Sequence, residues 1–189
     1  MNTPAHLIFG AAAFGRPGRV GVTTAALVGG LVPDLSLYLM VAWARWGQGA
    51  DTREIFGQLY FSDAWMAVFA VDNSIPLWSL ALILALWLRR PVLVAFLAAG
   101  VLHLGFDLLL HGEDARPQLW PLTDWRFASP LSYWDKSRYG GIIGPAELAT
   151  SAVLTGWMLW LHRGIGLRVV LVALMLAEAV SAGGWHFWM

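Results

Sequence analysis

The 189-residue sequence is 58% hydrophobic and only 13% charged, contains twelve tryptophans and has a mean hydropathy of +0.62. This composition is far from that of a soluble domain and predicts an integral membrane protein. The formal net charge is +0, and no Lys/Arg-rich run exists, so we expect no nucleic-acid partner. The sequence has no cysteine, so a bound metal would need histidine and carboxylate ligands.

The N-terminal apolar segment, residues 3–14, is too short to cross a bilayer, which takes about 20 residues. Basic residues do not precede it; Arg16 and Arg19 follow it instead, which argues against a cleaved signal peptide. We therefore expect a retained helix that is partly inserted or re-entrant. Such a helix is tolerated only if its ends are buried against protein or a water-filled cavity.

Longer apolar segments follow, separated by breaks at Pro91, Pro145 and the Gly164/Gly166 pair. They predict about five full spans, at residues 20–46, 73–90, 91–112, 145–163 and 166–189. Charged and aromatic residues mix in region 47–71, which predicts an interfacial amphipathic helix. Prolines and tryptophans in region 113–144 predict an irregular capping loop at the interface. The fold expected is a single all-α transmembrane helix bundle over residues 1–189.

Charge placement orients this bundle. The turns at Arg16/Arg19, Arg89/Arg90 and Arg163/Arg168 contain no acid and fall on one face. The positive-inside rule makes that face cytoplasmic. Most of the acids lie toward the other face, so the capping loop is expected to face the periplasm or exterior of a bacterial inner membrane.

Ionisable groups inside spans are expensive, so each is a functional hypothesis that needs a partner. His103, Asp107 and His111 are spaced i, i+4, i+8 and so share one helix face. At a rise of 1.5 Å per residue, His6, Asp34, Asp72, His103 and Asp107 lie roughly 15 to 26 Å from the arginine-rich face. This matching depth predicts a shared metal site with His6, Asp34, His103 and Asp107 as ligands, and with Asp72 and His111 as candidates for further ligands. The alternative is that His103 and Asp107 only hydrogen-bond each other or nearby backbone.

Several of these residues also have a structural interpretation. Asp34 follows Pro33, so it either points inward from a helix kink or caps the broken backbone. Asp72 is either a general base at the metal or the N-cap of the next span. Glu147 suits a helix N-terminus, whereas Glu178 lies mid-span with no obvious partner. Arg126, in the aromatic loop, would bind a phosphate or stabilise an oxyanion, unless it pairs with Asp124.

Four short motifs stand out along the chain: Ala5-His6-Leu7-Ile8-Phe9-Gly10, Gly30-Leu31-Val32-Pro33-Asp34, the His103 to Asp107 helix, and Trp120-Pro121 with Trp125-Arg126-Phe127. In these motifs the sequence resembles the YdjM-type family of predicted membrane-bound metal-dependent hydrolases. The family usually has a second acid where this chain has Ser36. It also carries a His-Arg-Gly-x-Thr-His-Ser element where this chain offers Asp72-Asn73-Ser74.

The ionisable residues inside the spans and the family resemblance together predict a hydrolase that uses a divalent metal at an outward-facing site within the membrane. The metal would be Zn²⁺, or Mn²⁺ or Fe²⁺ if oxygen ligands dominate. Membrane lipids are the expected partners, with a lipid or lipid-linked phosphate as substrate. Two alternatives remain: a small transporter or channel, and a metal-binding membrane protein without catalysis. A transport pathway would have to continue toward the arginine-rich face.

Overall fold

The computed structural model describes residues 1–184, and all regular structure in this part of the chain is helical. Within it, five stretches are long and apolar enough to cross a membrane: Val20–Gly47, Asp63–Trp87, Pro91–Leu110, Gly140–Leu161 and Ile165–Ala182. Large apolar side chains such as Leu80 and Val180 remain exposed on the outside of the bundle, where lipid would cover them. The predicted all-α fold with five spans is confirmed.

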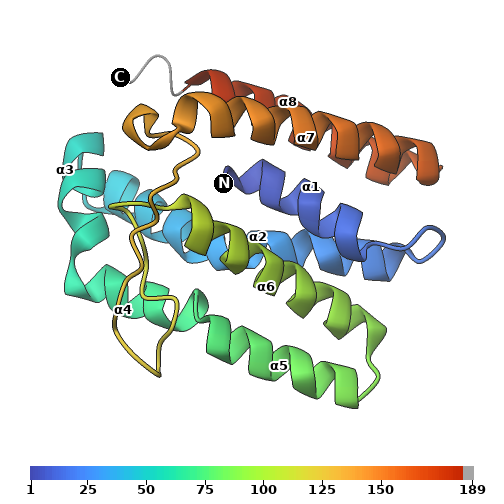
Figure 1. Cartoon of the computed structure of the whole chain (residues 1–189), viewed down its shortest axis with the longest axis horizontal. Coiled ribbons are helices and arrows are strands. Elements are labelled where there is room, and N and C mark those ends of the chain that lie inside the picture. Colours follow the sequence, from blue (N-terminus) through green and yellow to red (C-terminus); the bar gives the residue numbers. More distant parts are fainter. Residues whose placement is uncertain (185–189) are drawn as a thin grey trace.

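A short helix lies between a pair of helices on one side and the remaining spans on the other (Figure 1). In chain order they are α1 (Thr3–Phe14), α2 (Val20–Ala42) with a π-helical end η1 (Trp43–Gly47), α3 (Thr52–Gly57), η2 (Leu59–Phe61), α4 (Asp63–Asp72), α5 (Ile75–Trp87), α6 (Pro91–Leu110), η3 (Lys136–Arg138), α7 (Gly140–Leu161) and α8 (Ile165–Gly184). Helix α1 packs against α2 and α6 on one side and against α7 and α8 on the other. Helix α5 packs on α6 at the edge of the bundle.

The short N-terminal helix is the centre of the bundle. Ala5, Ile8 and Ala11 on α1 are all 0% exposed. Because α1 does not reach both membrane faces, its end groups need partners inside the protein. At the C-terminal end, the Gly15 N–H donates to the Ala11 carbonyl, and the Arg16 N–H that follows donates to the Thr23 hydroxyl. The backbone groups at this end of α1 are therefore hydrogen-bonded within the protein, as expected for a helix too short to cross the membrane.

Two glycines allow α1, α2 and α6 to approach backbone to backbone. A Cβ atom on Gly30 would lie 2.8 Å from the His6 carbonyl oxygen, and one on Gly29 would collide with the Phe96 carbonyl. Small residues at a helix crossing allow such an approach in membranes. The glycines therefore let α2 pack closely against both α1, which carries His6, and α6, which carries His103, while these two helices also contact each other.

We expect Gly30→Ala to destabilise the protein by about 1 to 3 kcal/mol, because the added methyl group presses on the His6 carbonyl. The unfolding free energy in detergent measures the effect. Gly105→Ala on α6 is the matched control, since a Cβ there meets no heavy atom within 4 Å. If both variants are equally stable, the close approach at Gly30 does not limit the packing.

Two predicted boundaries differ from the structure. The second span begins at Asp63, so α4 belongs to a spanning stretch with α5 instead of ending an interfacial region at residue 71. Helix α7 begins at Gly140 and continues through Pro145, because a proline near a helix start removes only one backbone hydrogen bond. The end of the last predicted span, residues 185–189, lies outside the described residues.

The three arginine-bearing turns lie together at one end of the bundle, on the right of Figure 1. They connect α1 to α2, α5 to α6 and α7 to α8. The capping segment that follows α6 lies at the opposite end, together with α3. We refer to these two ends as the arginine end and the loop end.

Candidate metal site

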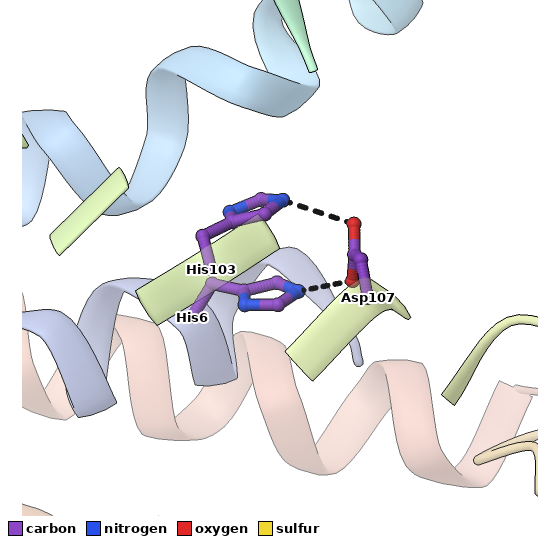
Figure 2. A group of neighbouring side chains, drawn as sticks. All are labelled: His6, His103 and Asp107. Carbon is purple, nitrogen blue, oxygen red and sulfur yellow. Dashed lines mark hydrogen bonds and ion pairs between the residues drawn. The ribbon is translucent and has the colours of Figure 1, made fainter. Parts of the chain in front are cut away.

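Three ligand-type side chains meet at the centre of the bundle. His103 and Asp107 lie one turn apart on α6, and His6 reaches them from α1 (Figure 2). One ligand atom from each residue lies within 4.8 Å of the others. All three side chains are buried, with exposed fractions of 2% for His6, 1% for His103 and 4% for Asp107. We call them the metal group, because they could hold a metal ion.

The Asp107 carboxylate is the common partner of both imidazoles. His6 Nε2 lies 2.9 Å from Asp107 Oδ1, and His103 Nε2 lies 3.1 Å from Asp107 Oδ2. The two rings stack face to face with centroids 3.6 Å apart and an interplanar angle of 12°. Figure 2 shows that both Nε2 atoms consequently point the same way, toward the carboxylate.

The hydrogen bonds of His103 indicate which of its two ring nitrogens could bind a metal ion. Its Nδ1 lies 2.8 Å from the Gly30 carbonyl oxygen. A carbonyl only accepts, so Nδ1 carries a hydrogen. Nε2 then faces only carboxylate oxygens, Asp107 Oδ2 at 3.1 Å and Asp34 Oδ1 at 3.7 Å. A neutral ring would direct its lone pair at negative oxygens, so this nitrogen needs either a second proton or a metal ion.

The donor set fits a divalent metal, with His103 better supported than His6. A metal-binding histidine usually donates its second ring N–H to a carbonyl or carboxylate, as His103 does to Gly30. The other nitrogen of His6, Nδ1, is buried and has no hydrogen-bond partner within the described chain. Two imidazoles and a carboxylate form the kind of mixed set that Zn²⁺ accepts, and Mn²⁺ or Fe²⁺ also bind such sets.

Asp34 lies beside the metal group but is held by other partners. Helix α2 runs through Pro33 without ending, which places Asp34 next to His103. Its Oδ2 accepts a hydrogen bond from the Thr3 hydroxyl at 2.5 Å, and its Oδ1 lies 3.3 Å from Arg116 Nη1. The structure therefore brings this predicted ligand to the site as the partner of a buried arginine.

Arg116, which the sequence interpretation did not single out, is a buried cation beside the metal group, as is the Met1 amino group, which lies 3.3 Å from Asp107 Oδ1. Arg116 is 6% exposed although it comes from the irregular capping loop. Its guanidinium donates to Asn73 Oδ1 at 2.8 Å and to the Tyr60 hydroxyl at 3.3 Å, and it stacks over Phe69 at 4.5 Å. The sequence does contain a signal for such a cation, because Asp34 and Asp107 both lie inside spans and buried acids there need a positively charged partner.

His111 forms an ion pair between two carboxylates. Its Nε2 lies 3.3 Å from Asp107 Oδ1, and its Nδ1 lies 2.7 Å from Asp114 Oδ2. Burial opposes the charged form of the ring, but Asp107 and the hydrogen bonds to Asp107 and Asp114 raise the pKa of His111 to about 9. In this arrangement both nitrogens carry hydrogens, so His111 contacts the predicted metal ligands as a cation.

The structure does not bring Asp72 and Arg126, the two predicted catalytic residues, into the metal group. Asp72 is the last residue of α4 and accepts a hydrogen bond from the Asn73 side chain at 2.5 Å. The N-cap of α5 is Ser74, whose hydroxyl accepts from the Leu77 N–H. Arg126 is exposed, and its Nη1 lies 3.8 Å from the Met66 sulfur.

A small hollow with no room for a water molecule lies beside Asp107, on the side of the capping loop. Asp107, His111, Arg116 and Gln118 line it. A wider cavity of about 330 Å³ lies at the arginine end, between residues such as Arg16 and Arg89, and does not include the metal group. The residues that line the small hollow together with Asp107 all lie beyond the end of α6, in or next to the capping loop.

No family model matches this chain, and neither curated proteins nor solved structures give a match. The site is therefore interpreted from its own geometry. That geometry describes a helical membrane protein with a buried His6–His103–Asp107 group that could hold a metal ion.

Proposed function

We propose that this chain is a membrane-bound, divalent-metal-dependent hydrolase that works at the metal group. The observation that carries the proposal is the environment of His103 Nε2, which faces the Asp107 and Asp34 carboxylates while Nδ1 is held by the Gly30 carbonyl. This is the arrangement of an oriented metal ligand. The motif resemblance to YdjM-type proteins supports the same activity.

In this proposal His6, His103 and Asp107 hold the metal, with Zn²⁺ as the first candidate and Mn²⁺ or Fe²⁺ as alternatives. When bound, the metal supplies polarisation of the scissile group and a water molecule whose pKa is lowered to about 7. Asp34 Oδ1 lies 3.7 Å from His103 Nε2 and is the residue placed to accept a proton. It replaces Asp72 in that role because Asp34 lies next to the metal group, whereas Asp72 is bonded to Asn73 at the end of α4.

Arg116 takes the anion-binding role that the sequence suggested for Arg126. Its guanidinium lies beside Asp107 and is buried, which strengthens charge-assisted hydrogen bonds to a phosphate or oxyanion. Because the metal group lies within an apolar bundle that lipid would surround, the proposed substrate class is a lipid or lipid-linked phosphate. We propose that this end faces the periplasm or exterior of a bacterial inner membrane, as the arginine turns indicate.

The test is hydrolysis of phospholipid and lipid-linked pyrophosphate by protein in mixed micelles, followed as release of the phosphorylated headgroup or of phosphate. We expect activity that needs added Zn²⁺ or Mn²⁺, stops with a chelator and falls at least about 100-fold in His103→Ala. His162→Ala is the control, since His162 lies in the turn after α7 at the arginine end. Metal binding without any hydrolysis would overturn the hydrolase and leave a metal-binding protein without catalysis.

A further inference from the structure

A second buried polar cluster lies between α1, α7 and α8. Glu147 on α7 and Glu178 on α8 are 6% and 0% exposed. Asn2 bridges them: its backbone N–H donates to Glu147 Oε1 at 2.8 Å, and its side-chain amide donates to Glu178 Oε1 at 3.2 Å. Glu147 was expected at the N-terminus of a helix, but α7 begins seven residues earlier, at Gly140. Glu178 was expected to have no obvious partner, but it accepts a hydrogen bond from Asn2.

The other oxygen of each carboxyl group has no donor. Glu147 Oε2 and Glu178 Oε2 are both buried and unpaired within the described residues. The two carboxyl groups also lie within hydrogen-bonding reach of each other. Two carboxylates this close in an apolar bundle cannot both be ionised at modest cost. A single proton on one Oε2 would turn that atom into a donor and the other into its acceptor, which pairs both atoms at once.

We propose that Glu147 and Glu178 form a proton-binding carboxyl pair that holds one proton between the two side chains, separate from the metal group. The proposal does not rest on the hydrolase activity. It uses neither His6, His103 nor Asp107.

The surroundings of the pair indicate the end of the bundle from which the proton exchanges. Ser151 and Thr155 follow Glu147 at one-turn spacing on the same face of α7, and their buried hydroxyls have no partner in residues 1–184. Buried polar groups of this kind are usually paired, by water if not by protein. Beyond them toward the arginine end, Met158 packs in an apolar cluster with Ala11, Leu27 and Leu171.

The polar row therefore stops at Thr155, and the apolar cluster separates it from the arginine end. Two further titratable groups lie near Glu147: the Met1 amino group at the start of α1, which is also 3.3 Å from Asp107 Oδ1, and the Tyr133 hydroxyl of the capping loop. Both belong to the loop-end side of the pair. The proton accordingly exchanges with water at the loop end, and the pair does not conduct protons across the membrane.

Labelling with dicyclohexylcarbodiimide tests the proposal, because this apolar reagent reacts with protonated carboxyl groups inside membranes. The full chain is labelled in liposomes, and the modified residues are identified by peptide mass spectrometry. We expect one label per chain, on Glu147 or Glu178, with labelling that declines as the pH is raised from about 6 to about 9. Glu113, which is 87% exposed, is an internal control that should stay unlabelled.

Two variants separate this proposal from the metal site. Glu178→Gln keeps an oxygen for the Asn2 amide and should lower labelling by at least about tenfold while leaving metal content unchanged. His103→Ala should lose metal and keep the label. Absence of label on both glutamates, or protection of the pair by Na⁺ or Ca²⁺ at constant pH, would overturn the proposal. Proton flux across wild-type liposomes that Glu178→Gln abolishes would overturn the exchange from one end only.

Discussion

Asp107→Asn should remove bound metal from the purified protein. The Asp107 carboxylate contacts His6 and His103 within 3.1 Å and His111 at 3.3 Å, so it is the side chain that joins the metal group. An amide keeps the size of the side chain but loses its negative charge, and it directs N–H donors at groups that need acceptors. We expect metal affinity to fall at least about 100-fold.

Elemental analysis of protein in detergent measures this loss, after dialysis against Zn²⁺ or Mn²⁺ and removal of free metal. The matched control is Asp72→Asn, which makes the same change at a carboxylate of α4 outside the metal group. Equal metal content in Asp107→Asn and Asp72→Asn would contradict the site. A metal content near zero in the wild type itself would do the same.

Replacing His103 or His6 by alanine should lower the metal affinity by different amounts. His103→Ala removes the ring that the Gly30 carbonyl orients, whereas His6→Ala removes a ring whose Nδ1 is unpaired in the described structure. A histidine whose second ring nitrogen is hydrogen-bonded binds a metal more tightly than one whose second nitrogen has no partner, so we expect the larger loss of affinity from His103→Ala, by roughly tenfold. Isothermal titration with Zn²⁺ measures the order, and a larger loss from His6→Ala would contradict it.

The spans were predictable because bilayer thickness determines how long an apolar helix must be. Hydropathy and the arginine turns placed α2 and α6 within a few residues of their observed ends. The boundary at Asp63 was missed because charge at a helix start resembles an interfacial segment. The sequence also could not show that α1 is the centre of the bundle, since this depends on the close approach at Gly29 and Gly30.

The metal group was predictable in part, for a similar reason. Helical spacing places His103 and Asp107 on one face, and equal depth brings His6 to the same level. Residues of the capping loop follow no such periodicity, so their positions could not be deduced. Consequently Arg126 was chosen from its aromatic neighbours, while Arg116, ten residues earlier, is the arginine that reaches the site.

Arg116→Ala should be among the most destabilising single changes outside the metal group. It leaves the buried Asp34 carboxylate without its ionic partner and removes the donors to Asn73 and Tyr60. Breaking a buried ion pair by removing one partner typically costs about 3 to 5 kcal/mol, because the remaining charge is uncompensated. For a chain of this size that loss lowers the melting temperature by on the order of 10 °C.

Arg126→Ala is the matched comparison, because it removes the same side chain from an exposed position in the same loop. Its effect on stability should stay within about 0.5 kcal/mol, as for most surface changes. Thermal unfolding in detergent compares the two variants. The double variant Arg116→Ala with Asp34→Asn should recover part of the stability lost in Arg116→Ala, because the uncompensated charge is removed as well. Equal melting temperatures for Arg116→Ala and Arg126→Ala would contradict the buried ion pair, and no recovery in the double variant would show that Arg116 acts through Asn73 and Tyr60 instead of Asp34.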